Sequence, residues 1–288
     1  MPIKTIQART QNFRLGRRRP VAHCPRLSLG GYMMSSLPPP PATCDYTQAA
    51  TSALSQMYGN DKLGDCVIAG MGHVVGVLTG NAGLPPFLYT SAQIIALYEA
   101  IGGYDPADPT TDQGCDEQTA LNYWENTGAP AGSHQIAGWL AVDATNRIEC
   151  QTAMYLFENL FFGVELPDAW INPAPPGSGF VWDTAGDPDP ANGHAFVGIG
   201  YDARGITIST WGMTGTLTYA AMAAYATTAA GGGLYTVVSQ DALNNVTKKA
   251  PNGFDWSQLV ADFDSMDGAV KPGTARSGVS RVGGTRKP

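Results

Sequence analysis

Two short segments, far apart in the sequence, carry a thiol and an imidazole. Cys66 opens the small, apolar run Val67–Leu78, which predicts a buried helix. His194 stands at the head of Ala195–Tyr201, a run rich in Val, Ile and Gly that predicts a strand. A thiol at a helix N-terminus lies at the positive end of the backbone dipole, and a neighbouring imidazole lowers its pKa further. Because the thiolate is the attacking species, this pair is the candidate nucleophile and base of a thiol hydrolase.

Each member of the pair has a structural alternative. A cysteine at the start of an apolar helix often serves as a small buried hydrophobe, and a histidine beside a strand is often purely structural. His73 lies two turns inside the predicted helix, which favours a place in the core or in a cleft wall. The sequence has no Cys/His cluster with zinc spacing and no glycine-rich phosphate loop, so we expect no metal and no cofactor.

Further motifs stand in a fixed order around this pair. They are Gly59–Cys66, Gln113–Gln118, His194–Tyr201 and Ser209-Thr210-Trp211-Gly212. Together, over roughly residues 45–240, they resemble the motifs of the papain-like cysteine peptidases. The resemblance implies the two-lobe fold of that family, with the cysteine in a helical N-terminal lobe and the histidine in an antiparallel β lobe.

The resemblance also implies roles for individual residues. Asn60 occupies the place of the family's oxyanion-hole glutamine, and Ser209 that of the asparagine that orients the histidine. Trp211 would shield the contact between His194 and Ser209 from water. The implied catalytic set is Cys66, His194, Asn60 and Ser209, and the implied cleft residues are Trp211, Gly64, Asp65 and Gly193.

The sequence also departs from the family pattern. Glu117 and Gln118 stand where the family has two glycines that leave the backbone free to pair with an extended substrate. Leu63 stands where the family has a cysteine, so Cys115 has no inherited disulfide partner. These differences predict a less open cleft and weak activity.

The implied chemistry is acyl transfer to the Cys66 sulfur, with peptide or amide bonds as substrates. His194 would hold the thiolate as an ion pair and later protonate the leaving group. The Cys66 N–H and the Asn60 amide would stabilise the oxyanion, each such donor lowering the barrier by about 3 kcal/mol.

The composition fits a globular α+β core between two extended ends. Of the 288 residues, 43% are hydrophobic and only 14% are charged. This hydrophobic content suffices to form a buried core. We predict a basic, Pro-rich arm over 1–43, a body over 44–250 and an extension with a basic tail over 251–288. Within the body the helical lobe is predicted at about 44–160 and the β lobe at 161–250. Beyond the Cys66 helix, helices are predicted at 92–101, 116–126, 151–160 and 220–230, and strands at 137–142, 161–166, 195–201, 205–210, 217–219 and 234–238.

Basic residues concentrate at the two ends. Residues 1–30 carry seven Lys or Arg and residues 271–288 carry five, whereas all 24 acids lie between these segments. Such ends should not fold by themselves. We expect them to bind acidic surfaces of protein subunits in a homo- or hetero-assembly. Contact with nucleic acid phosphates, or a purely solubilising role, are the alternatives.

Two functional hypotheses follow. The first is a papain-like thiol hydrolase, a peptidase or amidase within a larger assembly. The second is a catalytically idle structural subunit, such as a phage or virion component, fastened by its basic arms. The sequence has no apolar run long enough to cross a membrane and no pattern of a secretory signal. Its five cysteines are an odd number, which favours reduced thiols. We therefore expect a reducing cytoplasm or a virion, and no membrane partner.

Overall fold

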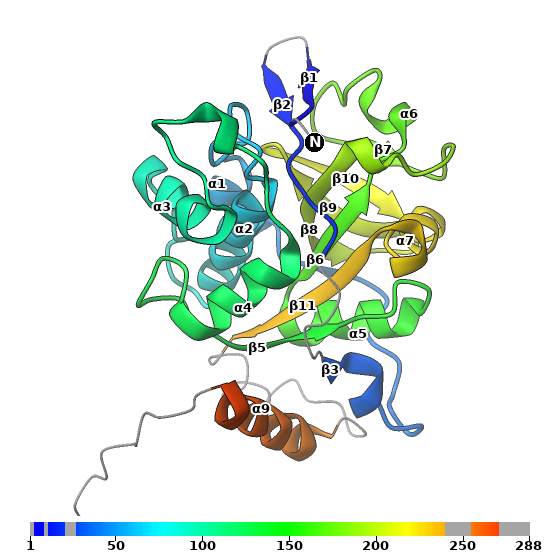
Figure 1. Ribbon diagram of the computed structural model, residues 1–288. Helices are drawn as coiled ribbons and strands as arrows, with labels where there is room; N and C mark the ends of the chain where they lie inside the picture. Colours follow the sequence, from blue (N-terminus) through cyan, green and yellow to red (C-terminus); the bar gives the residue numbers. More distant parts are fainter. Residues whose placement is uncertain (1–2, 9–10, 21–26, 240–254, 271–288) are drawn as a thin grey trace, which may run out of the picture. The chain divides into compact units, whose positions relative to one another are not determined.

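The computed structural model describes residues 3–8, 11–20, 27–239 and 255–270 (Figure 1). The chain divides into two compact units, Met1–Phe254 and Asp255–Pro288. In the second unit the described element is the helix α9 (Trp256–Val270). The predicted basic tail at 271–288 lies outside the described residues, as do Arg9 and Arg26 of the N-terminal arm.

The first unit has most of its helices in the N-terminal half and most of its strands in the C-terminal half. Its helices are α1 (Thr51–Leu54), α2 (Cys66–Asn81), α3 (Ser91–Gly102), α4 (Glu117–Thr127), α5 (Arg147–Phe157), α6 (Asp168–Ile171) and α7 (Tyr219–Tyr225). Its strands are β1 (Thr5–Gln7), β2 (Asn12–Arg14), β3 (Leu27–Ser28), β4 (Cys44–Asp45), β5 (Ile136–Ala141), β6 (Leu160–Glu165), β7 (Phe180–Trp182), β8 (Gly193–Tyr201), β9 (Gly205–Thr210), β10 (Met213–Thr218) and β11 (Gly233–Ser239). Within the described ranges, no helix is both long and apolar enough to cross a membrane.

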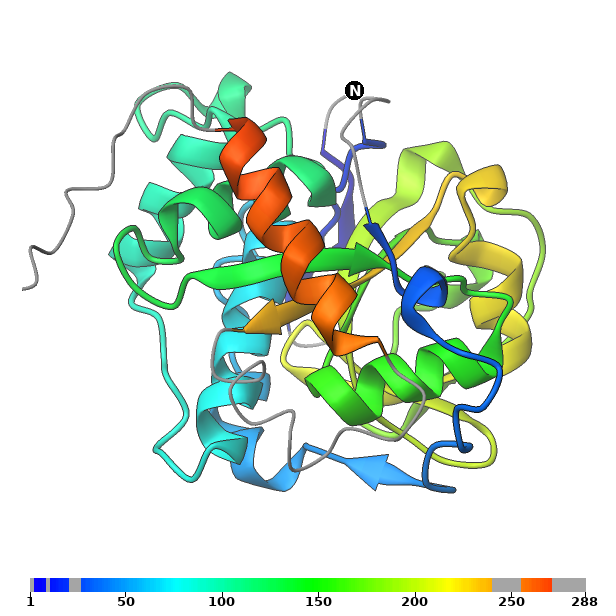
Figure 2. The ribbon, with the colours of Figure 1, turned by 90° about the horizontal axis from the view of Figure 1, so that it is seen from below.

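The main sheet follows the order β3-β5-β11-β6-β8-β9-β10-β7, and β4 pairs with β8. Its pairs are antiparallel except β10 with β7 and β3 with β5, which are parallel. β5 and β11 lie side by side although they are far apart in the sequence (Figure 2). The predicted α+β class, with a helical N-terminal lobe and a largely antiparallel C-terminal lobe, is confirmed.

Side-chain caps place the starts of two helices. Thr90 and Gln93 form a capping box at α3, each side chain bonding to the backbone N–H of the other. The Asp116 side chain accepts from the Thr119 N–H, so α4 begins at Glu117. This cap fixes the position of Glu117, whose role in the site is described below.

The helix predicted at 220–230 is too long. α7 ends at Tyr225, and the backbone of Thr227 is extended, with φ −90° and ψ 152°. The Thr227 side chain accepts from the Ala230 N–H and starts a separate turn. A threonine that bonds to the backbone ahead of it competes with helix continuation, which explains the early end.

α2 is buried on nearly every side. Residues Cys66–Val77 are all buried, which is typical of a helix inside a core. The helix contacts β8, and the residues Ala195, Val197 and Ile199 of this strand belong to the same hydrophobic cluster. The strand and the helix that carry the predicted site are therefore fixed against each other.

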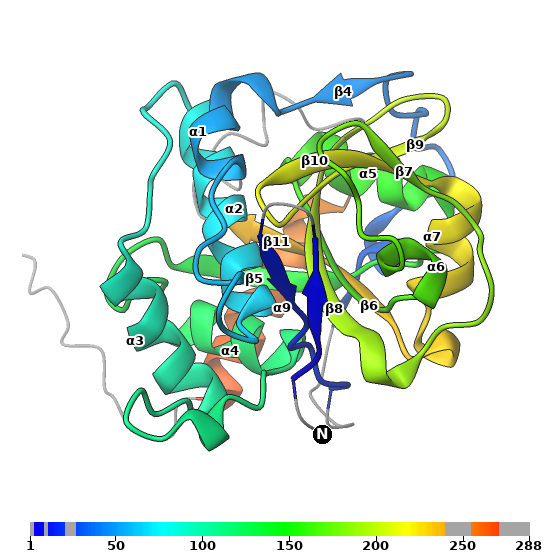
Figure 3. The same cartoon turned by 90° about the horizontal axis from the view of Figure 1, so that it is seen from above.

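The N-terminal segment is folded against the first unit. β1 and β2 form an antiparallel hairpin, and the chain after β2 passes between the helical lobe and the sheet (Figures 1 and 3). Its residue Arg17 pairs as an isolated bridge with Cys115. The described part of this segment also bonds to the rest of the chain, since the Arg14 N–H donates to the Asn60 carbonyl.

Ile68→Ala is expected to lower the free energy of unfolding by about 2–5 kcal/mol, because it leaves a cavity in the core around α2. Ile148→Ala is the matched control, because Ile148 is 45% exposed and should change stability by less than about 0.5 kcal/mol. Urea unfolding of the full chain measures both. Equal losses in the two variants would show that α2 is not the buried centre.

Candidate active site

Cys66 is the first residue of α2 and lies where this helix meets β8. Its side chain is buried, and the backbones of Ala195 and Gly16 lie close enough to the sulfur to lower its pKa. Ala195 directly follows His194. Folding therefore brings together the two segments that were predicted to carry the chemistry.

Burial dominates the electrostatics of this thiol. It raises the pKa of Cys66 to about 12, although the nearby backbones of Ala195 and Gly16 act in the opposite direction. Burial also raises the pKa of the adjacent Asp65 carboxyl well above its ordinary value. The helix N-terminus favours a thiolate, but the loss of water outweighs it here. The Cys66 thiol is therefore protonated at neutral pH.

His194 is fully buried on the side of β8 that faces away from α2. Side chains alternate along a strand, so His194 shares a side with Phe196 while Ala195 faces α2. The imidazole stacks on the Trp211 ring, with 4.3 Å between centroids. Burial lowers the pKa of His194 to about 3, so the ring is neutral at neutral pH.

A threonine, and not the predicted serine, contacts the imidazole. The Nε2 atom of His194 and the Oγ1 atom of Thr210 are 2.7 Å apart. The prediction that Ser209 orients His194 is corrected: neighbouring residues of β9 point to opposite sides, and the Ser209 hydroxyl donates to the Leu54 carbonyl at 3.5 Å. Within the described structure the His194 Nδ1 atom has no hydrogen-bond partner, so it is not bonded to the Cys66 thiol in this conformation.

Two other predicted site residues make local contacts. The Asn60 side-chain amide donates to the Leu63 carbonyl at 3.1 Å, so it is engaged by its own turn. The Gly64 N–H donates to the Asp112 carboxylate at 3.0 Å. These bonds hold the loop before Cys66 in a compact shape.

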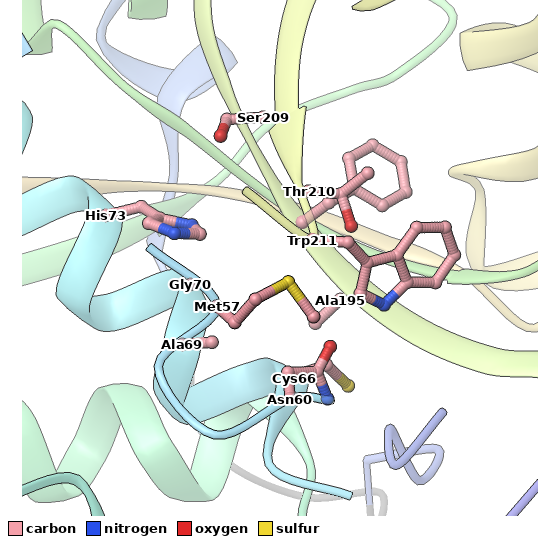
Figure 4. Close-up of a pocket in the computed structure, with 11 residues that line it drawn as sticks. Met57, Asn60, Cys66, Ala69, Gly70, His73, Ala195, Ser209, Thr210 and Trp211 are labelled. Atoms are coloured by element: carbon pink, nitrogen blue, oxygen red, sulfur yellow. The ribbon is translucent and has the colours of Figure 1, made fainter. Parts of the chain in front are cut away.

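Four of the eight predicted site and cleft residues, Cys66, Asn60, Ser209 and Trp211, line one pocket between α2 and the sheet, and His194 is not among its lining residues (Figure 4). The lining residues are Met57, Asn60, Cys66, Ala69, Gly70, His73, Ala195, Phe196, Ser209, Thr210 and Trp211. In Figure 4 the Met57 side chain extends across the middle of the pocket. His73 lies in the pocket wall, with its Nε2 atom 3.0 Å from the Gln56 carbonyl oxygen, and burial lowers its pKa to about 4.

Residues 12–19, hereafter the cleft segment, run through the site along the helical lobe. The Arg14 N–H donates to the Asn60 carbonyl at 2.9 Å, and the Cys115 N–H donates to the Gly16 carbonyl at 3.1 Å. A Cβ on Gly16 would lie 1.8 Å from the Gly64 carbonyl oxygen. Only glycine permits the backbone to approach the loop before Cys66 so closely.

The cleft segment also contacts the β lobe. The Arg17 N–H donates to the Gly193 carbonyl at 3.1 Å, and a Cβ on Gly193 would lie 2.1 Å from the Arg17 carbonyl oxygen. The Phe13 ring stacks on Trp211, with 4.7 Å between centroids and 6° between planes. The segment thus bridges both lobes and covers the Cys66 sulfur.

Ion pairs that the sequence analysis missed hold the cleft segment. They are Arg14–Asp112, Arg17–Glu117 and Arg19–Glu165. The Arg17 and Glu117 side chains are 1% and 0% exposed and lie 3.0 Å apart. The sequence signals were the basic, acid-free N-terminus and a glutamate in place of a family glycine, but nothing local linked one to the other.

The described residues contain no group of three or more His, Cys, Asp or Glu side chains arranged to hold a metal. The cysteines Cys44, Cys66, Cys115 and Cys150 are free thiols.

Comparisons with known proteins identify the fold. No protein-family model and no curated protein matches the chain. Xylellain, a cysteine protease from Xylella fastidiosa, is similar in structure, with a TM-score of 0.58 and 15% identity over 78% of this chain and 96% of that one. The digestive procathepsin L 3 of the Tenebrio molitor larval midgut has a TM-score of 0.52 and 13% identity over 77% and 75%. The chain is a divergent member of the papain-like fold.

Thr210→Val is expected to lower the free energy of unfolding by about 1–3 kcal/mol, because it leaves a buried imidazole nitrogen without its partner. Ser209→Ala should cost less, because the bond from Ser209 to Leu54 is long. Chemical denaturation of the two variants tests this order. A larger loss for Ser209→Ala would restore the original assignment of Ser209.

Proposed function

We propose that this protein is a papain-like thiol hydrolase, acting on peptide or amide bonds, whose cleft is held closed by its own N-terminal segment. The observation that carries the proposal is that Cys66 and Ala195 meet in the wall of one pocket. This arrangement puts the sulfur one residue away from His194, whose Nδ1 atom is otherwise unpartnered within the described structure. To form the pair, the His194 imidazole must move toward the Cys66 sulfur when the cleft opens, and catalytic contacts often tighten only when substrate binds.

Release of the cleft segment activates the pair. Water and substrate replace residues 12–19, so the burial that raises the pKa of Cys66 and lowers that of His194 is relieved. The thiol proton then moves to the imidazole. Thr210 holds the ring through Nε2, and the Nδ1 atom is then the one that faces the sulfur.

The reaction proceeds by acyl transfer. The Cys66 thiolate attacks the substrate carbonyl, the carbon–sulfur bond forms, and the Cys66 N–H and the Asn60 amide stabilise the oxyanion. The carbon–nitrogen bond breaks as the His194 imidazolium gives its proton to the leaving amine. Water, deprotonated by the imidazole, then hydrolyses the thioester and regenerates the thiol.

The cleft segment is positioned as a cover and not as a substrate. The backbone of Gly16 lies next to the sulfur, and the Gly16 carbonyl is held by the Cys115 N–H. The Gly16 carbonyl is therefore not bound by the donors of the oxyanion hole. This explains why the Cys66 nucleophile does not cleave the segment that covers it.

The second candidate is an idle papain-fold structural subunit. The filled cleft and the unbonded His194 Nδ1 favour it. In that role the basic arms, 1–30 and 271–288, would fasten the body to protein subunits of an assembly. The described arginines of the first arm already pair with acids of this chain, so fastening would depend on the other basic residues.

Gly16→Val should release the cleft segment, because a side chain there collides with the Gly64 backbone. Hydrolysis of labelled casein or of fluorogenic peptide amides should rise about tenfold or more over the wild-type rate, and the rise should require both Cys66 and His194. In the Gly16→Val background, Cys66→Ser should abolish turnover and His194→Ala should lower it by about 10²–10⁴-fold.

Gly31→Val is the matched control, because a Cβ on Gly31 meets nothing within 4 Å. It should leave the low wild-type rate unchanged. A folded Gly16→Val protein, verified by circular dichroism, that hydrolyses none of these substrates would contradict the proposal and leave the idle subunit as the function.

A further inference from the structure

Glu117 forms a buried binding site for a guanidinium group. Three hydrogen bonds join it to Arg17: Nε lies 3.1 Å from Oε1 and 3.0 Å from Oε2, and Nη2 lies 3.0 Å from Oε1. The Arg17 Nη1 atom donates to the Gly231 carbonyl at 2.6 Å. The planar fork of the guanidinium is thus matched by three fixed acceptors.

The walls of this site belong entirely to the body. Glu117 is the first residue of α4, placed there by the Asp116 cap. Gly163 of β6 lies directly under the ion pair, where an added Cβ would be 1.6 Å from Glu117 Oε1 and 2.8 Å from Arg17 Nε. Gly231, just before β11, supplies the carbonyl. Three separate segments of the body therefore surround the Arg17 guanidinium.

The site lies one residue from the reactive sulfur. The Gly16 backbone packs on Gly64, two residues before Cys66. The next residue, Arg17, donates its N–H to the Gly193 carbonyl and its side chain to Glu117. A chain that occupies the cleft in the same way presents the side chain beside the covered sulfur to Glu117.

The geometry points to a subsite for arginine: we infer that Glu117, with the Gly231 carbonyl, selects substrates that carry arginine next to the bond facing Cys66. This inference rests on the proposed hydrolase function. When the cleft segment leaves, Glu117 loses its counter-charge, and covering this carboxylate again without a cation would be costly. A substrate arginine replaces the lost partner fully. A lysine ammonium is a point charge that cannot bridge the carboxylate and the carbonyl in the same plane.

A second buried acid extends the preference. The Glu165 side chain is 3% exposed and binds Arg19, whose side chain is 60% exposed. Because this pair is open to water on one side, it contributes less than a buried pair does. Glu117 therefore sets the specificity and Glu165 adds to it.

Peptide binding tests the subsite without any turnover. The protein is full-length Gly16→Val/Cys66→Ser, whose cleft segment is displaced and whose nucleophile is absent. The probes are a fluorescent peptide with the sequence of residues 12–19 and a twin with neutral citrulline at the place of Arg17. Anisotropy titrations should show the citrulline peptide binding at least about tenfold more weakly, since bonds to a charged group are lost. In the same protein with Glu117→Gln added, the two peptides should differ by less than about twofold.

Equal binding of the two peptides while Glu117 is present would overturn the inference. Should the displaced variant not fold, full-length Arg17→Ala serves instead, with thermal unfolding as the readout. Methylguanidinium should raise its midpoint by several degrees, whereas methylammonium at the same concentration should not, and Arg17→Ala/Glu117→Gln should respond to neither. Equal responses to the two cations would also overturn it.

These outcomes separate the two proposals. A protein that prefers the arginine peptide but hydrolyses nothing retains the guanidinium site and loses the hydrolase function. A protein that hydrolyses substrates without regard to arginine retains the function and loses the subsite.

Discussion

The exclusion of water from the Cys66 sulfur is the constraint on which the rest of the structure depends. Three elements exclude it: α2 carries the sulfur, β8 places Ala195 beside it, and the cleft segment covers it with Gly16. A helix N-terminus favours a thiolate, but only by a modest amount compared with the cost of burying a charge. The closed site therefore holds a neutral thiol and a neutral imidazole. The same atoms in contact with water would have ordinary pKa values and could exchange a proton.

The cleft segment gives the uneven charge distribution a structural meaning. Basic residues collect at the N-terminus because several of them pair with acids of the chain's own body, and the pair between Arg17 and Glu117 is fully buried. Removing one partner of a buried ion pair is costly, because the charge of the other partner is left uncompensated. The pair between Arg17 and Glu117 therefore makes the closure of the cleft specific to this segment. In the proposed hydrolase, opening would require another cation for Glu117, which would link access to Cys66 with recognition of substrate.

The parts of this account that depend on local pattern could be predicted from the sequence. The apolar run after Cys66 and the Val/Ile/Gly run after His194 each specify an element, and the order of motifs specifies the fold. The choice between Ser209 and Thr210 could not be made, because it depends on which side of β9 each residue faces. The cleft segment was also missed, since it has little regular structure and takes its hydrogen bonds from Asn60, Cys115 and Gly193 in three distant parts of the chain.

The pH dependence of Cys66 alkylation tests the central claim most directly. Iodoacetamide is applied to Gly16→Val and to Gly16→Val/His194→Ala, and the modified cysteine is identified by peptide mapping. With His194 present, the rate is predicted to reach its plateau below neutral pH, and removal of His194 should shift the inflection toward the ordinary thiol value of about 8.5. Superimposable curves with an inflection near or above that value in both proteins would contradict the claim that release of the cleft segment creates a thiolate–imidazolium pair.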